Sequence, residues 1–184
     1  MTSYMSRHLA IDEKQAAELR QHYWRRYGAT LLGLMRHHGT DPDHFLHHTH
    51  QFPDLAAIVI AEPALKSMLQ RLPGRKILFS NAPHHYTETV LAAIGIHRSF
   101  SAVYTIERLS YRPKPAVSAF LDLLRAEKLD PQQCIMVEDS LPNLVTAKKL
   151  GMKTVWVSAS THGNPCVDVK IKSILDLPKR LGRL

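Results

Sequence analysis

The sequence predicts an α/β protein, in which a doubly wound parallel (Rossmann-like) sheet follows a small helical domain. Short apolar runs bounded by turn residues are typical of buried parallel strands. Segments with the apolar spacing of a helix alternate with these runs, which indicates right-handed βαβ units. The amino-terminal part shows helical spacing alone. We therefore expect a helical domain over residues 1–60, a sheet domain over 61–184, and clear strands at 76–80, 134–137 and 154–157.

The amino-terminal region is expected to be all-helical up to about Ile58. Met1, Tyr4, Met5, His8 and Leu9 fall at i, i+3, i+4, i+7 and i+8. This is the pattern of an amphipathic helix already under way at the first residue, with Thr2 or Ser3 as an alternative cap. A second helix carries Ala16, Leu19, Tyr23 and Tyr27 on one side, and Gly39 ends a third. Asp41-Pro42 then begins another helix, because proline is well tolerated in a first turn.

The remaining elements follow in alternating order. Glycine at a helix carboxyl end supports two boundaries, at Gly95 and at Gly151. A weaker strand is expected at 102–105 and a short one at 167–171. The predicted helices are 64–72, 83–94, one around 117–124, and 143–150.

Composition indicates a soluble globular protein with anionic partners. Hydrophobic residues make up 45% and charged residues 22%, and no apolar run approaches the roughly 20 residues of a membrane span. The amino terminus has no signal-peptide pattern, and the two cysteines, Cys134 and Cys166, fit a reducing compartment, so we expect a cytoplasmic protein. A net charge of +8 favours anions. The charge does not distinguish nucleic acid from a phosphorylated metabolite, and a solvated basic surface is the favoured interpretation. Because no nucleic-acid-binding motif occurs, we expect neither nucleic acid nor membrane as partner.

Polar residues with phosphate chemistry follow the apolar runs. Ser80-Asn81 ends the first run, and Glu138-Asp139-Ser140 ends the second. Lys114 stands between two prolines just before a helix. Open α/β sheets bind ligands at the carboxyl ends of their strands, so a hydroxyl, an ammonium and a carboxylate pair should meet at one edge. Taken singly, each has a plainer explanation: a helix cap, a surface lysine, and an acidic pair at a helix entrance.

In this order the motifs resemble those of the haloacid dehalogenase-like phosphohydrolases. The matching segments are Leu78-Phe79-Ser80-Asn81-Ala82, then Arg112-Pro113-Lys114-Pro115, then Val137-Glu138-Asp139-Ser140 with Asn143. The helical region, with Tyr23-Trp24-Arg25-Arg26-Tyr27-Gly28, resembles the cap of the pyrimidine 5′-nucleotidase branch. The resemblance extends over nearly the whole chain.

This resemblance implies that the partner is a small phosphorylated metabolite. It also implies a Mg²⁺-dependent hydrolysis of nucleoside 5′-monophosphates through an aspartyl-phosphate. By analogy Ser80, Asn81 and Lys114 bind the substrate, and Lys114 and Glu138 are the catalytic residues. Asp139 and Asn143 are the expected Mg²⁺ ligands, and the helical cap reads the leaving group.

One motif of the family is missing from the sequence. The family places its nucleophile in Asp-x-Asp after an apolar strand, whereas the only Asp-x-Asp here, Asp41-Pro42-Asp43, follows His37-His38-Gly39-Thr40. We expect a truncated chain, either by a misassigned start or as a true remnant, that is inactive by itself and prone to self-association. The alternative function is a nucleophile-less module that binds a phosphate or a partner. A receiver-like signalling domain is a weaker third reading, because its acidic pair would precede the hydroxyl residue.

The cap region is rich in histidine. The spacing of His44, His47 and His48 allows a transition-metal site, but a solvated face is the favoured interpretation because no cysteine or carboxylate cluster accompanies them. His84 and His85, which follow the first strand, are expected at the site entrance or on a helix surface.

Overall fold

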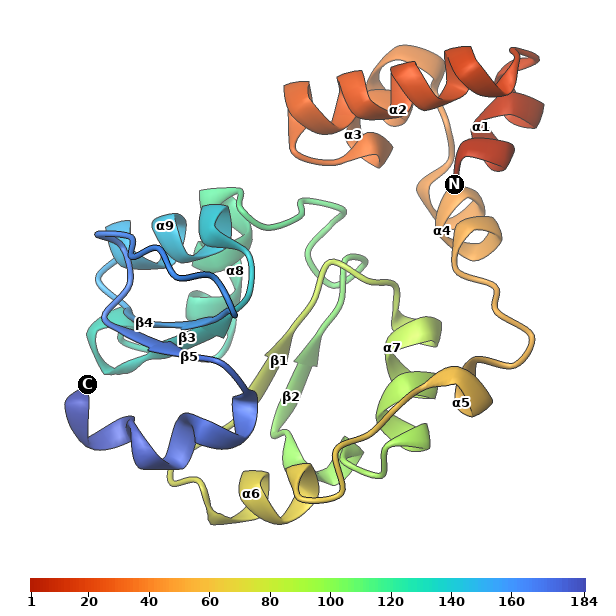
Figure 1. Cartoon of the computed structure of the whole chain (residues 1–184). Helices are drawn as coiled ribbons and strands as arrows, with labels where there is room; N and C mark the ends of the chain where they lie inside the picture. Colours follow the sequence, from red (N-terminus) through yellow and green to blue (C-terminus); the bar gives the residue numbers. More distant parts are fainter. The chain divides into compact units, whose positions relative to one another are not determined.

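The computed structural model describes residues 1–184, with every side chain except that of Arg183. The chain divides into two compact units (Figure 1). The first comprises Met1–Val59, Phe79–Ala93 and Tyr104–Pro113, and the second comprises Ile60–Leu78, Ile94–Val103 and Lys114–Leu184.

Local sequence signals set the helix ends of the first unit. Asp12 and Gln15 form a capping box, in which the Asp12 carboxylate accepts the Gln15 N–H at 2.8 Å. Gly28 ends the same helix with a φ of 80°, a conformation that residues with a side chain rarely adopt. The helices are α1 (Thr2–Leu9), α2 (Glu13–Tyr27), α3 (Thr30–His38), α4 (Pro42–Thr49), α5 (Leu55–Ile58) and α7 (His84–Ala93).

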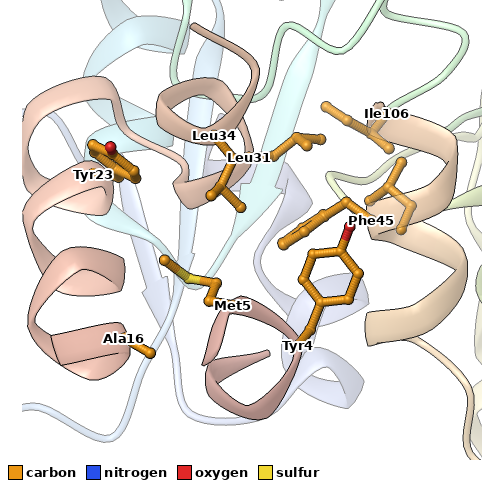
Figure 2. Close-up of a cluster of buried hydrophobic side chains, with 9 residues drawn as sticks. Tyr4, Met5, Ala16, Tyr23, Leu31, Leu34, Phe45 and Ile106 are labelled. Atoms are coloured by element: carbon orange, nitrogen blue, oxygen red, sulfur yellow. The ribbon is translucent and has the colours of Figure 1, made fainter. Parts of the chain in front are cut away.

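The first four of these helices share one hydrophobic core with the loop after β2, and Figure 2 shows most of its side chains. Met5, Ala16 and Leu34 at its centre are 0% exposed. Helices α2 and α3 pack closely because Gly33 has no side chain there: a Cβ at this position would come within 2.6 Å of the Tyr23 Cβ. The buried cluster consists of Tyr4, Met5, Ala16, Tyr23, Leu31, Leu34, Phe45, Leu46 and Ile106.

Two short strands, β1 (Ile77–Phe79) and β2 (Ala102–Tyr104), form a two-stranded sheet. Ser101 N–H donates to the Lys76 carbonyl at one end, and Ser80 N–H donates to the Tyr104 carbonyl at the other, both at 2.8 Å. Residue numbers rise together along both strands, so the pair is parallel.

The second unit contains a three-stranded parallel sheet in the order β3-β4-β5. Val137, Val155 and Val157 pack with Leu177 in one apolar cluster, and α9 packs on β3 and β4. The elements are α6 (Leu65–Arg71), α8 (Val117–Ala126), β3 (Ile135–Glu138), α9 (Leu141–Lys149), β4 (Lys153–Val157) and β5 (Val169–Ile171), with 3₁₀ turns η1 (His97–Ser99), η2 (Pro131–Gln133), η3 (Ile174–Lys179) and η4 (Leu181–Arg183).

Every predicted strand is present within two residues of its expected bounds, and the region before β1 is helical as predicted. The expected single sheet is instead two hydrogen-bonded sheets, because among the described strands β1 pairs only with β2, and β3 only with β4. At the amino terminus neither Thr2 nor Ser3 caps α1. Met1 occupies the cap position and offers no side-chain acceptor.

Candidate active site

The site residues of the first unit follow β1. Ser80 Oγ accepts the Ala82 N–H at 3.0 Å, which closes a tight turn and leaves the hydroxyl hydrogen for donation to another acceptor. Its backbone is held on the other side by the hydrogen bond to Tyr104. Asn81 is exposed and lines a cavity of the first unit. A serine fixed in this way suits the binding of an anionic oxygen.

The second unit places Lys114 against Glu138. Lys114 Nζ lies 2.6 Å from Glu138 Oε2, and the two side chains are only 9% and 10% exposed. The other carboxylate oxygen, Oε1, accepts the N–H groups of Asp139 and Ser140 at 3.1 and 3.2 Å. Glu138 therefore orients Lys114 and holds the turn into α9.

The titration of the carboxyl pair reflects this arrangement. Burial alone raises the pKa of Glu138, but its hydrogen bond with the Asp139 side chain, the attraction of the Lys114 ammonium and the Ser140 N–H outweigh it and lower the pKa to about 2. The pKa of Asp139 shifts in the opposite direction. It is raised, first by the hydrogen bond with Glu138, then by burial and by repulsion from that carboxylate.

Asp139 and Asn143 occupy the turn and first helical positions after β3. Asp139 is exposed, whereas Asn143 is 7% exposed within α9. Trp156 of β4 donates its indole N–H to the Asp139 carbonyl at 2.9 Å. The sequence interpretation assigned Trp156 only to a strand, and no local signal reveals this contact, which fixes the backbone that carries the Asp139 carboxylate.

The donor set fits a hard cation. Carboxylate and amide oxygens are the ligands that Mg²⁺ prefers, and usually one or two protein carboxylates suffice because waters and substrate complete the shell. A cation beside Asp139 would also offset the repulsion from Glu138 that raises its pKa. Among all the side chains described, however, no group of three or more His, Cys, Asp or Glu residues is placed to hold a metal.

The first unit contains a cavity of about 460 Å³. Its walls come from α2, α3 and α4 and from the loops after β1 and β2. Apolar side chains dominate the lining, and Arg20, His50 and Asn81 contribute polar groups. The volume lies in the range of pockets that bind small molecules.

The Asp-x-Asp of the sequence has structural roles. Asp41 caps α4 by accepting the His44 N–H at 2.7 Å, and Asp43 Oδ1 accepts the Tyr111 hydroxyl at 2.6 Å. That hydrogen bond, together with burial and nearby carboxylates, raises the pKa of Tyr111 to about 12. Neither aspartate follows a strand, in agreement with the sequence interpretation.

The cap histidines pair with tyrosines. Tyr4 Oη lies 2.8 Å from His44 Nδ1, Tyr23 Oη lies 2.7 Å from His38 Nε2, and Tyr27 Oη lies 2.6 Å from His37 Nε2. The transition-metal alternative gains no support, since no suitable cluster occurs among the described side chains. Both cysteines are free thiols, as the sequence predicts.

The family model for a hydrolase described as haloacid dehalogenase-like matches residues 5–151. The chain belongs to the haloacid dehalogenase-like hydrolases. This membership confirms the resemblance at the level of the superfamily. The expected pyrimidine 5′-nucleotidase branch is a narrower assignment, which family membership leaves open.

Relatives within the family differ in their substrates. Hexitol phosphatase B of Escherichia coli K12 is 32% identical over 104 residues, covering 54% of this chain and 46% of that protein. A bifunctional riboflavin kinase/FMN phosphatase of Arabidopsis thaliana is 28% identical over 126 residues, covering 59% of this chain and 33% of that protein. The chain thus spans less than half the length of these curated relatives.

Solved structures of this family share the fold. A HAD phosphatase from Thermococcus onnurineus superposes with a TM-score of 0.64 at 21% identity, covering 98% of this chain and 86% of that chain. The L-2-haloacid dehalogenase of Xanthobacter autotrophicus gives 0.55 at 19% identity, covering 65% of this chain and 60% of that chain. The predicted α/β, Rossmann-like class is therefore confirmed. No helix among the described residues is long and apolar enough to cross a membrane.

Proposed function

We propose that this protein is a phosphohydrolase domain for a small phosphorylated metabolite. The observation that carries the proposal is the buried Lys114–Glu138 pair beside Asp139, at the carboxyl end of β3. An ammonium held at a fixed position by a carboxylate is suited to stabilise the charge that develops on a transferring phosphoryl group. The relatives named as phosphatases of hexitols and FMN support the same reaction class.

Each site residue then has one proposed role. The Ser80 hydroxyl and the Asn81 side chain bind phosphoryl oxygens. Lys114 neutralises the charge of these oxygens, and Glu138 holds the Lys114 ammonium in place. Asp139 and Asn143 would hold Mg²⁺, with Asp139 as the main protein ligand. When bound, the ion would supply electrostatic stabilisation of the phosphate.

We also propose that the nucleophilic aspartate is not among these 184 residues. The only Asp-x-Asp is committed to capping α4 and to binding Tyr111. The two separate sheets support the view that a strand ending in Asp-x-Asp would pair with β1 and β3. Strand edges without a partner strand favour pairing between chains, hence the proposed self-association. The second candidate function is a phosphate- or partner-binding module. It follows from the same missing carboxylate, because a chain without the nucleophile can bind a phosphate without hydrolysing it.

For the substrate we propose a nucleoside 5′-monophosphate, used in the cytoplasm. The cavity beside Asn81 is walled mainly by apolar side chains, which suit a flat base better than a polyol. The pyrimidine preference rests on the resemblance of the helical region to nucleotidase caps.

Phosphate release tests the proposal. The 184-residue chain and a fusion that adds a relative's Asp-x-Asp strand before Met1 are assayed with UMP, FMN and a hexitol phosphate, with and without Mg²⁺. We expect no turnover by the first and Mg²⁺-dependent turnover of UMP by the second, lost in its Lys114→Ala form. Turnover by the 184-residue chain contradicts the missing nucleophile. A well-folded fusion that is inactive on every substrate favours the binding module.

A further inference from the structure

We infer that the cavity of the first unit binds a planar heterocycle that has an N–H group beside a carbonyl oxygen. His50 accepts a hydrogen bond from the N–H group, and Arg20 donates one to the carbonyl oxygen. Uracil and the flavin ring both present this imide group. The inference rests on the proposed function for the idea that the cavity receives the leaving group. The residues that carry it are otherwise independent of the phosphate-binding residues.

The hydrogen bonds around His50 determine which of its nitrogens carries the proton. The Thr49 hydroxyl donates to the Phe45 carbonyl at 2.8 Å, so Thr49 Oγ1 can only accept from His50. His50 Nδ1 lies 3.0 Å from Thr49 Oγ1 and 3.1 Å from the Leu46 carbonyl, and both of these oxygens are acceptors. Nδ1 must therefore bear the hydrogen, which leaves Nε2 as a bare acceptor when the ring is neutral.

The ring is kept neutral by its surroundings. Burial lowers the pKa of His50, and repulsion from His85 and from the amino terminus adds to this effect. The bond to the Leu46 carbonyl and the charge of Glu107 oppose the shift without reversing it. At neutral pH His50 thus presents an acceptor, and a ligand must supply the hydrogen.

Arg20 supplies the complementary donor. Its Nε is buried and has no hydrogen-bond partner in the described part of the chain. An arginine guanidinium can only donate, and a buried donor without a partner costs about 1–3 kcal/mol. The backbone of Arg20 is fixed by the Thr30 hydroxyl, which donates to its carbonyl at 3.2 Å. Arg20 also lines the cavity, so the remaining N–H groups of its guanidinium suit the carbonyl oxygen of a ligand there.

The remaining walls select for a flat, weakly hydrated ring. Trp24 on the cavity lining is 63% exposed, so its ring face is open for stacking. The hydroxyl groups of a hexitol would lie against apolar walls without partners, which disfavours a polyol. The other apolar residues of the lining are Met1, Ala29, Leu31, Leu32, Phe45, Leu46, Ile106 and Pro113.

Calorimetric titration of the 184-residue chain with uridine, riboflavin and their N3-methyl derivatives tests the inference. Methylation replaces the N–H and should weaken binding about tenfold, the effect of one lost hydrogen bond to a buried acceptor. His50→Asn keeps a side-chain N–H for Leu46 and Thr49 but removes the Nε2 acceptor. It should bind each ligand and its methyl derivative equally. His47→Asn, at an exposed position of α4 three residues before His50, is the matched control and should retain the preference.

The two natural ligands distinguish the source of the imide, since preference for uridine indicates a nucleotide and preference for riboflavin indicates a flavin. Failure of both to bind, equal binding of the methylated forms, or a preference that survives in His50→Asn would overturn the inference. None of these ligands carries a phosphate, so the result is independent of hydrolysis. A fusion that hydrolyses hexitol phosphate while the chain ignores both imides would refute this inference and leave the phosphohydrolase proposal standing.

Discussion

Removing the charge of Glu138 tests whether the buried ion pair organises the second unit. In Glu138→Gln the ammonium of Lys114, whose side chain is 9% exposed, loses its charged partner at 2.6 Å. The amide oxygen still accepts a hydrogen bond, but the buried ammonium loses the carboxylate charge that lies 2.6 Å away in the parent. Breaking one partner of a buried pair costs about 3–5 kcal/mol, and we expect about 3 kcal/mol here because shape and one acceptor remain. For a chain of this size that corresponds to a melting temperature lower by about 6–12 °C.

The measurement uses the fluorescence of Trp156 in a Trp24→Phe background. Trp156 is buried in the second unit and hydrogen-bonded to the Asp139 carbonyl, so its fluorescence reports the unfolding of this unit alone. Denaturant unfolding without Mg²⁺ is compared for the parent, Glu138→Gln, Lys114→Met and the double variant. Lys114→Met should cost less, because the two backbone N–H groups still satisfy Glu138.

The double variant supplies the control. Since it leaves no unpaired charge, its loss should be at least about 2 kcal/mol smaller than the sum of the single losses. A loss below about 1 kcal/mol for Glu138→Gln, or additive single losses, would refute the view that the pair is buried and coupled.

Three further outcomes are expected. Gly33→Ala should destabilise the first unit by about 2–3 kcal/mol, because the new Cβ meets Tyr23 within 2.6 Å, and an unchanged melting curve would contradict the close packing of α2 and α3. Hydrogen bonds and the Lys148 ammonium at 2.5 Å lower the pKa of Asp168 in spite of its burial. Because its pKa is lowered, ionised Asp168 stabilises the fold fully at pH values above the ordinary pKa of 3.8, and this stabilisation is lost as the pH falls through the lowered pKa. The melting temperatures of the parent and of Asp168→Asn should therefore differ at pH 7 and converge at acidic pH. Weak Mg²⁺ binding, followed by calorimetry, should disappear in Asp139→Asn, and an unchanged isotherm would place the ion elsewhere.

Much of the fold could be predicted from local patterns. The apolar runs located β1, β3 and β4, since a buried strand must be apolar over a few consecutive residues wherever it packs. Glycine and proline positions located most helix ends, because backbone conformation there depends on the residue itself. The polar residues after β1 and β3 were likewise predicted, because strand ends are readable from sequence.

The candidate site could be predicted only as a set of residues. The sequence identified Lys114 and Glu138 but not that they form a buried pair, since burial depends on what packs around them and they lie 24 positions apart. Nothing local in the sequence links Tyr111 to Asp43, 68 positions away, or Trp156 to the Asp139 carbonyl.

The sequence by itself thus determined the α/β class, the order of the strands along the chain and the chemical types at their ends, because each depends on the character of consecutive residues. Only the tertiary structure decided that the strands form two sheets, that Asp43 accepts from Tyr111, and that Lys114 and Glu138 form a buried pair. These properties depend on which groups meet across the fold, and hydrogen-bond partners and burial are set by packing rather than by neighbours in the chain.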